Sequence, residues 1–302
     1  MKSPVAMVGI GLMGHGIARN LARHGYPLTV LEHPGNQPLD ALKAAGVATA
    51  PDAATLTAQA ETVILCVTGT PQVEAVLFGE GDTPGVLQSL RPGTVVIDCS
   101  TAVPSSTERV AQAVADAGGR FLDAPMTRTP KEAAEGRLNL LVGGDAALFA
   151  ECRPLLACFA ENIVHAGPVG AGHRMKLLHN FVSLGFVALL AEAAACAARG
   201  GVAAEVLVQV LAQGGGGGMA LERLKPFLLN GDPSGLRFFM ANAQKDLGYY
   251  TAMAADSGAA RTIAEGVYGT FAQAVAQGDG QALVPELVAQ LTRQGDGVVR
   301  VA

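Results

Sequence analysis

A glycine-rich segment near the start of the chain has the spacing of a phosphate-binding turn. Residues 9–14 read GIGLMG, with a β-branched run before them and a helical pattern after them. In such a turn the first glycine permits a sharp bend, the second lets phosphate oxygens approach the backbone, and the third lets helix and strand pack closely. The N–H groups at the start of the helix add the positive end of its dipole. We therefore predict a dinucleotide-binding site at Gly9, Gly11, Leu12, Met13 and Gly14.

An acidic residue bears on which dinucleotide binds. Glu32 ends the predicted second strand, about 20 residues after the glycines, where a carboxylate accepts hydrogen bonds from the ribose 2′-hydroxyl of NAD. The same carboxylate repels the 2′-phosphate of NADP, and no Lys or Arg occurs between Glu32 and Lys43. These residues favour NAD over NADP. The alternative is a glycine-rich turn followed by an ordinary surface glutamate.

A lysine and an asparagine suit proton transfer to a carbonyl oxygen. Lys176 stands at the start of a long apolar helical pattern, and Asn180 follows one helical turn later on the same face. Desolvation of the amine would lower its pKa toward neutrality, which suits a proton donor beside a developing alkoxide. The amide of Asn180 could orient the substrate or the lysine. The alternative for Lys176 is a solvated lysine near a helix start.

Polar residues also follow two predicted strands, at the edge where open α/β sheets bind ligands. Ser100 and Thr101 come after the strand at 94–98, and Val67 and Thr68 come at the end of the strand at 62–67. We expect Val67 and Thr68 to border the nicotinamide ribose, and Thr101 to bind the cofactor as well. Besides binding a ligand at this edge, Ser100 could cap the helix that starts at residue 104, and these two roles are compatible.

Short β-branched runs alternate with helical patterns from residue 4 to about residue 165. Strands are predicted at 5–9, 28–31, 62–67, 94–98, 121–123, 138–142 and 163–165, and helices at 12–24, 39–45, 71–77, 104–117 and 146–159. Such alternation implies parallel strands joined by right-handed crossovers. The fold class is therefore α/β, a doubly wound Rossmann-type parallel sheet.

The pattern changes after about residue 168, where long Ala- and Leu-rich segments replace the strand-like runs. We predict a dinucleotide-binding domain at 1–166. A long connecting helix would then open an all-α domain at 167–302 for substrate binding and oligomerisation. Residues 181–198 are apolar enough to suggest a membrane span, but Glu192 near the middle favours a buried helix.

Composition excludes several classes of protein. Half of the 302 residues are hydrophobic and 16% are charged, so a disordered chain is excluded. A net charge of −5 gives no reason to expect nucleic acid or an anionic membrane as a partner. The five cysteines are scattered and form no C-x-x-C motif, and the histidines form no H-E-x-x-H motif. Neither a metal site nor a disulfide framework is therefore expected. A reducing cytoplasm fits best.

Five ordered segments carry a resemblance to a known family. They are GIGLMGHGIARNLARHG at 9–25, DCSTAVP at 98–104, DAPM at 123–126, GPVGAGHRMK at 167–176 followed by Asn180, and KDL at 245–247. Together they resemble the β-hydroxyacid dehydrogenase family, which includes 3-hydroxyisobutyrate dehydrogenase and tartronate semialdehyde reductase. The resemblance implies catalysis by Lys176 with help from Asn180, and a substrate hydrogen bond from Ser100.

The resemblance also implies roles for less obvious residues. Asp98 and Asp123 are structural in the family pattern. Lys245 would reach the cofactor or the substrate, and Asp246 would hold the helices in place.

The chain departs from the family pattern in the substrate loop, where Thr127, Arg128 and Thr129 replace a Ser-Gly-Gly sequence, and we expect these three residues to bind the substrate. An arginine there resembles sulfolactaldehyde reductase. Since a guanidinium binds anions in bidentate fashion, we hypothesise that Arg128 binds a sulfonate, phosphonate or carboxylate at the end of the substrate. The alternative is that Arg128 turns outward or pairs with Glu132. His179 replaces a second asparagine before Asn180 and could be a relay or a packing residue.

These residues together predict an NAD(H)-dependent oxidoreductase that interconverts a small β-hydroxy acid and its semialdehyde. An ordinary 3-hydroxyisobutyrate or tartronate semialdehyde-type dehydrogenase remains an alternative. Imine reduction is disfavoured, because enzymes of that kind resemble this family but lack the lysine. A non-catalytic NAD-binding regulator is expected to lack the pair of Lys176 and Asn180. The apolar helical half favours a homodimer or homotetramer.

Overall fold

The computed structural model describes residues 2–294, and the chain forms two compact units, Met1–Lys176 and Leu177–Ala302. The units meet within a single helix, α8 (Ala171–Arg199). The predicted boundary at 166/167 falls before this division. The first turn of α8 belongs with the first unit because its backbone is hydrogen-bonded to Asp123 there.

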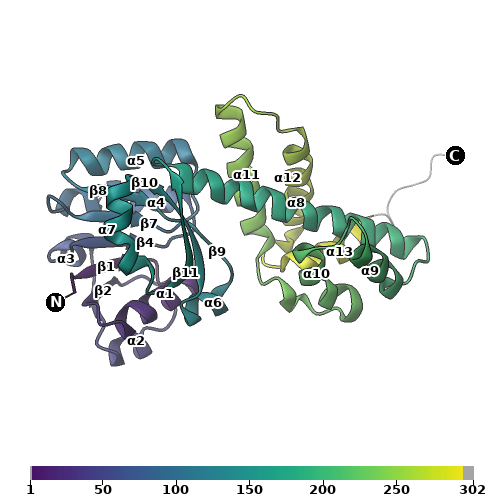
Figure 1. Ribbon diagram of the computed structural model, residues 1–302, viewed down its shortest axis with the longest axis horizontal. Coiled ribbons are helices and arrows are strands. Elements are labelled where there is room, and N and C mark those ends of the chain that lie inside the picture. The colour runs from purple at the N-terminus through teal and green to yellow at the C-terminus, as the bar shows by residue number, and fades with distance from the viewer. Residues whose placement is uncertain (1, 295–302) are drawn as a thin grey trace. The chain divides into compact units, whose positions relative to one another are not determined.

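The first unit is built on a mixed sheet whose larger part is parallel (Figure 1). Its parallel strands lie side by side in the order β3 (Ala48–Ala50), β2 (Leu28–Leu31), β1 (Val5–Val8), β4 (Thr62–Leu65), β7 (Val95–Asp98) and β8 (Arg120–Asp123). This is the strand order of dinucleotide-binding folds, in which the ligand crevice lies outside the carboxyl ends of the strands. The predicted Rossmann-type sheet is confirmed.

One edge of the sheet runs differently from the prediction. The strands there are β9 (Met126–Thr127), β10 (Leu138–Gly144) and β11 (Ala160–Gly167). β10 is antiparallel to both β8 and β9, and β11 is parallel to β10. The expectation of a wholly parallel sheet was wrong here, because the helix between β9 and β10 packs against another helix instead of crossing the sheet.

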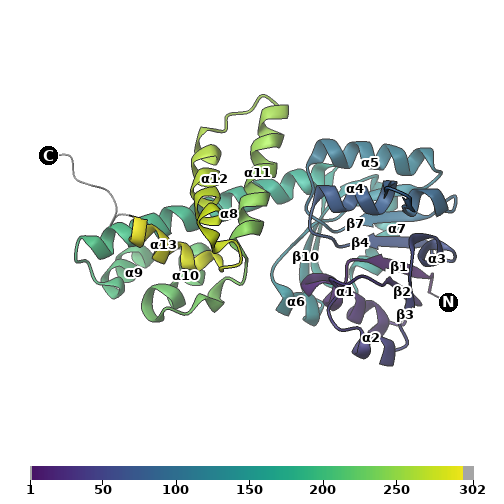
Figure 2. The ribbon, with the colours of Figure 1, turned by 180° about the vertical axis from the view of Figure 1, so that it is seen from behind.

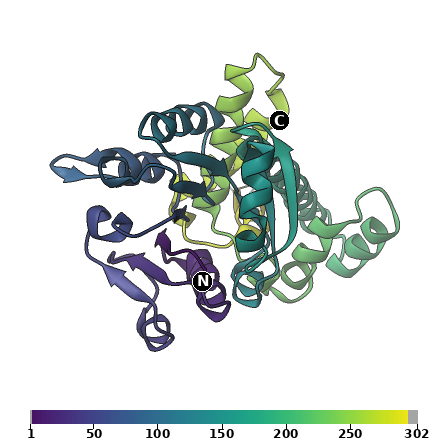
Figure 3. The same cartoon turned by 60° about the vertical axis from the view of Figure 1, so that its left-hand side comes forward.

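Helices cover both faces of the sheet (Figures 2 and 3). Successive residues of β1 point to opposite cores, since Val5 and Met7 pack on one face while Ala6 and Val8 pack on the other. The first core includes side chains of α1 (Leu12–Arg23), α2 (Asp40–Ala44) and α7 (Ala146–Leu156). The second includes side chains of α3 (Ala53–Thr57), α4 (Thr70–Phe78) and α5 (Pro104–Asp116). Burial on both faces explains why these strands read as continuous apolar runs.

Helix α6 (Pro130–Glu135) docks on α1 through a buried asparagine. The Asn20 side-chain amide donates to the carbonyl oxygens of Ala133 and Gly16, each at 2.9 Å. A Cβ at Gly16 would lie 2.6 Å from the backbone carbon of Ala133, so only glycine allows this approach. The helix that follows the substrate loop is thereby tied to the helix that follows the glycine-rich turn.

The second unit is helical throughout its described part, apart from one isolated bridge between Phe239 and Leu283. After α8 come α9 (Ala204–Gln213), α10 (Met219–Asn230), α11 (Met240–Asp256), α12 (Thr262–Ala274) and α13 (Leu287–Gln294). Their core gathers leucines, phenylalanines and alanines from these helices around the middle of α8. Within residues 2–294, α8 is the single helix long and apolar enough to cross a membrane. Part of it forms this core, but only 39% of its most apolar stretch is buried, so the expected buried helix is found in part.

Shorter elements complete the chain. A two-stranded hairpin is formed by β5 (Gly79–Glu80) and β6 (Thr83–Pro84). Short 3-10 turns lie at Val86–Ser89, Pro233–Gly235 and Val284–Glu286, and a π turn lies at Val275–Asp279.

Candidate active site

The glycine-rich turn between β1 and α1 has the geometry that its sequence predicts. Gly9 has φ +91°, and a Cβ there would lie 2.3 Å from the Cys66 carbonyl oxygen. A Cβ at Gly14 would lie 1.9 Å from the Gly9 carbonyl oxygen, so both positions require glycine. Gly11 differs, because a Cβ there would meet no protein atom within 4 Å. Open space over Gly11, beside the uncapped first turn of α1 at Leu12 and Met13, fits the approach of a diphosphate.

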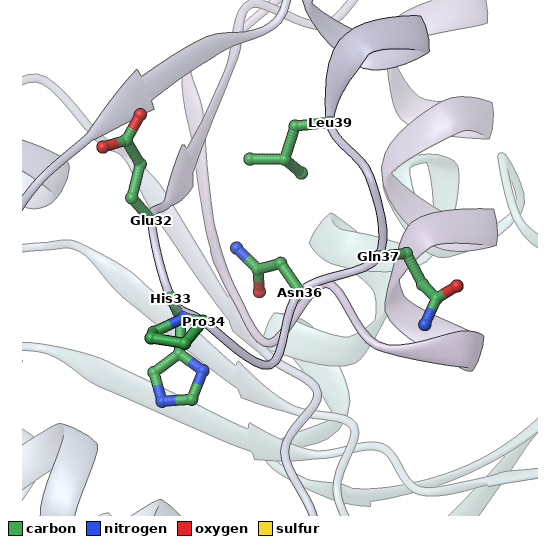
Figure 4. A pocket seen from close by; sticks show the side chains of 6 residues that line it. All are labelled: Glu32, His33, Pro34, Asn36, Gln37 and Leu39. Atoms are coloured by element: carbon green, nitrogen blue, oxygen red, sulfur yellow. The ribbon is translucent and has the colours of Figure 1, made fainter.

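A shallow pocket lies beside this turn, at the carboxyl end of β2 (Figure 4). It measures about 390 Å³ and is lined by Glu32, His33, Pro34, Asn36, Gln37 and Leu39. Asn36 closes the loop onto the glycine turn, since its side-chain oxygen accepts from Ile10 N at 3.2 Å and its amide donates to the Leu31 carbonyl at 2.9 Å. The pocket is placed to receive the adenosine half of a dinucleotide.

The charge around Glu32 differs from the expectation. The Nζ atom of Lys43, the first lysine or arginine after Glu32 in the sequence, lies 3.7 Å from Glu32 Oε1. Both side chains are about half exposed, so the pair is weak and the carboxylate stays accessible. A positive charge nevertheless lies beside Glu32, where the sequence predicts only the negative charge of the carboxylate. Lys43 reaches this place because α2 folds back over the end of β2.

The loops that follow β4 and β7 bring Val67 and Ser100 together, as the sequence predicts. Ser100 Oγ accepts from Val67 N at 3.0 Å, and Ser100 N donates to Asp98 Oδ1 at 2.9 Å. Thr68 and Thr101 are the next residues of the same two loops. Asp98 is buried, and this burial raises its pKa, although His173 and Ser100 oppose the shift. Ser100 is therefore held at the carboxyl edge of the sheet by the backbone N–H of Val67 and by the side chain of Asp98.

Two thiols close to these loops carry no reactivity of their own. Burial and the neighbouring Asp98 raise the pKa of the Cys66 thiol to about 12. Burial likewise raises the pKa of Cys99 well above its ordinary value. Both thiols stay protonated at neutral pH and act as small apolar side chains.

The substrate loop places its three predicted residues in different surroundings. Thr127 Oγ1 accepts from the Asn139 amide at 3.0 Å. Arg128 has φ +82° and is the one described residue other than glycine with a positive φ. Its guanidinium donates to Glu161 Oε2 at 2.5 Å and to the carbonyl of Arg137.

The remaining residue of the loop forms a capping box at the start of α6. Thr129 is the N-cap, and its backbone N–H and hydroxyl both donate to the Glu132 carboxylate. These hydrogen bonds lower the pKa of Glu132. The alternative raised from the sequence, in which Arg128 turns outward or pairs with Glu132, holds in part: Arg128 forms an ion pair, but with Glu161. The charge of Arg128 also contributes to the lowered pKa of Glu132, after the hydrogen bonds from Thr129.

Lys176 lies near the start of α8, and a buried carboxylate sets the position of that start. Asp123, at the end of β8, accepts from Gly170 N and His173 N, both at 2.8 Å. Gly172 leaves space for this carboxylate, because a Cβ at that position would lie only 2.7 Å from Asp123 Oδ2. The first turn of α8, and Lys176 one turn later, are thereby fixed at the carboxyl edge of the sheet. This agrees with the structural role expected for Asp123.

The second unit holds Asn180 and Lys245 around one buried acid. The Asn180 amide nitrogen donates to Asp246 Oδ2 at 2.6 Å, and Lys245 Nζ lies 3.2 Å from Asp246 Oδ1. The Asn180 oxygen lies 2.9 Å from His179 Nδ1. Because a carboxylate can only accept, Asp246 orients the Asn180 amide with its nitrogen toward the carboxylate and its oxygen toward His179. It does so as a residue that holds two helices together, which is the role expected for it.

Sequence reasoning missed the contributions of Asn20, Asn36 and His173. Asn20 lies within the motif at 9–25, and His173 within the motif at 167–176, so their places were noted without a role. Their partners are far away in the chain, 113 residues for Asn20 and 66 for His173. No local signal identifies such contacts, although a helical asparagine among apolar neighbours hints that its amide has a distant partner.

Comparisons with known proteins agree with this geometry. Residues 4–167 match the family model described as the NAD binding domain of 6-phosphogluconate dehydrogenase. Residues 170–291 match the model described as NAD-binding of NADP-dependent 3-hydroxyisobutyrate dehydrogenase. The chain belongs to the β-hydroxyacid dehydrogenase family. As a member it is an NAD(P)-dependent dehydrogenase that acts on CH–OH groups.

Individual relatives match most of the chain. The NAD-dependent L-serine dehydrogenase of Pseudomonas aeruginosa is 35% identical over 250 residues, covering 81% of this chain and 83% of the relative. The 3-hydroxyisobutyrate dehydrogenase of the same organism is 32% identical over 287 residues, covering 91% and 94%. The solved structure of Mycobacterium tuberculosis 3-hydroxyisobutyrate dehydrogenase with L-serine is 27% identical. It covers 96% of this chain and 99% of that one, with a TM-score of 0.85.

Proposed function

We propose that this dehydrogenase interconverts a small β-hydroxy acid and its semialdehyde with NAD(H), and that Lys176 moves the proton. The observation that carries the proposal is the anchoring of α8 by Asp123. It fixes the turn that precedes Lys176 at the sheet edge where Ser100 also lies. A proton donor and a hydroxyl at the carboxyl edge, next to a glycine turn open to a diphosphate, form the set that carbonyl reduction requires.

The residues of the chain have separable tasks in this reaction. When bound, the nicotinamide supplies or accepts the hydride. The Lys176 ammonium donates its proton to the carbonyl oxygen as negative charge develops there, and takes the proton back in the oxidative direction. Ser100 Oγ, which already accepts from Val67 N, keeps its own hydrogen for the substrate. Asn180, four residues after Lys176 in α8, contributes an amide whose orientation is set by Asp246.

We propose a substrate with three or four carbons and an anionic end. The names of two relatives support a small hydroxy acid, since one is an L-serine dehydrogenase and the other a 3-hydroxyisobutyrate dehydrogenase. Arg128 supports a strong anion at the far end, such as a sulfonate, phosphonate or carboxylate. Its left-handed backbone favours glycine, so an arginine kept there at an energetic cost indicates a task for its charge. That task requires the guanidinium to exchange Glu161 for the substrate anion.

We also propose NAD as the preferred cofactor, because Glu32 lines the pocket at the end of β2 with an accessible carboxylate. Lys43 moderates this preference, since an ammonium 3.7 Å from Glu32 offsets part of the repulsion that a 2′-phosphate would meet.

The test is a panel of short aldehydes that differ in their terminal group, namely sulfonate, phosphonate, carboxylate and methyl. Each is assayed for oxidation of NADH and of NADPH. Turnover concentrated on an anionic member with NADH supports the proposal. A preference for the carboxylate alone keeps the anionic end but assigns the chain to the ordinary semialdehyde reductases, and equal rates with the methyl compound contradict an anionic end.

A lysine variant separates catalysis from binding. Lys176→Ala is expected to lower kcat by about 100-fold or more, within the range of general acid catalysis, while NADH binding measured by fluorescence is unchanged. Tight NADH binding by a wild-type protein that reduces no member of the panel would favour the non-catalytic regulator instead.

An apolar stripe supports our proposal of a homo-oligomer. Val182, Phe186 and Leu189 lie on one side of α8 within the second unit, with exposed fractions of 53%, 55% and 64%, and Val206 and Val210 of α9 are similarly exposed. We propose that a second copy of the chain covers this stripe in a homodimer or homotetramer, which light scattering after size exclusion would measure. The cytoplasm remains the proposed location, and imaging of a tagged protein tests it.

A further inference from the structure

A histidine that the proposed reaction does not use is completely buried beside the site. His173 lies in the first turn of α8 and has an exposed fraction of 0%. Its ring stands between the carboxylates that end β7 and β8. Nε2 is 3.9 Å from Asp98 Oδ2, and Nδ1 is 3.8 Å from Asp123 Oδ2. Both carboxylates are buried as well, so the three groups share an environment in which each contact is strongly felt.

The two ring nitrogens join different parts of the first unit. Nε2 lies 3.2 Å from the Ser100 carbonyl oxygen. Because a carbonyl can only accept, Nε2 carries the proton of this hydrogen bond. Nδ1 lies 2.8 Å from Thr107 Oγ1 of α5. The backbone N–H of His173 donates to Asp123, so the residue is held at three points.

We infer that His173 is a positioning residue that sets the distance between Ser100 and Lys176. This inference rests on the proposed function of those two residues. The link has two parts. The ring fixes Ser100 through its carbonyl oxygen, and α8 continues for one turn from His173 to Lys176. A shift of about 1 Å between reacting groups can cost about 100-fold in rate, so a rigid link of this kind has kinetic consequences.

The surroundings explain why an imidazole fits here. Asp98 uses Oδ1 to accept from Ser100 N, while its Oδ2 has no hydrogen-bond partner in the described part of the chain and lies nearest to His173 Nε2. The Nε2 hydrogen goes to the Ser100 carbonyl, while Asp98 Oδ2, at 3.9 Å, lies beyond hydrogen-bond distance. The two ring nitrogens, one on either side of Cε1, let the imidazole contact Ser100 and Thr107 at once.

Two substitutions divide the function of the ring. In His173→Gln the amide nitrogen can occupy the place of Nε2 and keep the hydrogen bond to Ser100. In His173→Asn the shorter amide can occupy the place of Nδ1 and keep only the contact with Thr107. Both variants remove the ring and retain a polar amide, so each controls for the other. Thr107→Val is the matched control for the opposite contact.

The kinetic result expected is a difference in kcat at unchanged KM for NADH. His173→Gln and Thr107→Val should stay within about threefold of the wild type. His173→Asn should lose about 10- to 100-fold in kcat with the preferred substrate of the panel. Equal kcat values for His173→Gln and His173→Asn would overturn the inference, because the inference assigns the kinetic effect to the hydrogen bond with Ser100 that only the glutamine can keep.

Amide hydrogen exchange gives a measurement that does not need activity. The N–H of Val67 bonds to Ser100 Oγ, and the N–H of Ser100 bonds to Asp98. Exchange at these two amides should be faster in His173→Asn than in His173→Gln, and unchanged exchange in His173→Asn would also overturn the inference. If the wild type reduces no aldehyde of the panel, the proposed function fails, and this exchange alone decides whether His173 fixes Ser100.

Discussion

Replacement of Arg128 by glycine tests whether its charge binds substrate. The native φ of +82° costs a residue with a side chain about 1–2 kcal/mol, and glycine removes that cost. Greater freedom of glycine in the unfolded chain takes back about 0.4–1 kcal/mol. The lost contacts with Glu161 and Arg137 lie at an exposed surface, where solvent screens them. We therefore expect the free energy of unfolding of Arg128→Gly to stay within about 1 kcal/mol of the wild type.

A large kinetic effect of the same substitution would then report substrate binding. A hydrogen bond to a charged group contributes about 1.5–3 kcal/mol, and 1.4 kcal/mol corresponds to a factor of about 10. Arg128→Gly should lower kcat/KM for the anionic aldehyde by about 10- to 150-fold, mainly through KM. The aldehyde that ends in a methyl group should lose less than threefold.

The assay is steady-state oxidation of NADH with both aldehydes, with thermal melting as the check on folding. Glu161→Gln is the matched control, because it releases the guanidinium without removing it. If Glu161 competes with the substrate anion, KM for the anionic aldehyde should fall in this variant. Equal losses for both aldehydes in Arg128→Gly, together with an unchanged KM in Glu161→Gln, would refute the reasoning and leave Arg128 as a surface ion pair.

Three further predictions concern the first unit. Gly11→Ala should fold with unchanged stability and bind NADH weakly, whereas Gly14→Ala should lose both stability and binding, because its Cβ would lie 1.9 Å from a carbonyl oxygen; melting and fluorescence titration distinguish them. Burial raises the pKa of Asp98, so the folded state holds this proton more tightly than the unfolded chain does. The stability of the wild type relative to Asp98→Asn should therefore fall as pH rises from about 4 through the raised pKa, and denaturation at several pH values would show no such trend if the carboxyl were unperturbed. Asn20→Ala should cost about 1–3 kcal/mol, because it leaves a buried carbonyl of α6 without a donor; a loss below about 0.5 kcal/mol in chemical denaturation would contradict this.

Local patterns in the sequence predict the sheet and the glycine turn well, because the determinants are neighbours in the chain. The turn needs a bend at Gly9 and close packing at Gly14, and both requirements are visible within six residues. The parallel direction of strands β1 to β8 in the sheet follows from the alternation of strands and helices, although their order does not. The antiparallel direction of β10 relative to β8 cannot be predicted in this way, because hydrophobic periodicity indicates which residues are buried and not in which direction a strand runs.

Partners in the candidate site could be predicted only where both lie in one motif. The Ser100 loop and the start of α8 were located correctly, since each follows a recognisable pattern. The ion pair of Arg128 with Glu161 joins residues 33 positions apart, one in the loop after β9 and the other on β11, whereas Glu132 was the nearer candidate in the sequence. Similarly, Lys43 reaches Glu32 because α2 is short and turns back, a feature that charge spacing alone does not reveal.

The anchoring of α8 also has a consequence for how the protein is made. The N–H groups that donate to Asp123 lie 47 and 50 residues later in the chain. During synthesis, therefore, this carboxylate has both hydrogen bonds only after His173 has been added. The nucleotide-binding half is therefore incomplete when its last strand, β11, emerges at residue 167. A fragment that stops there would lack the N–H partners of Asp123 and the ring that lies between Asp98 and Asp123, and we expect it to aggregate. The first turns of α8 therefore complete the fold of the first unit and also place Lys176 at the edge of its sheet.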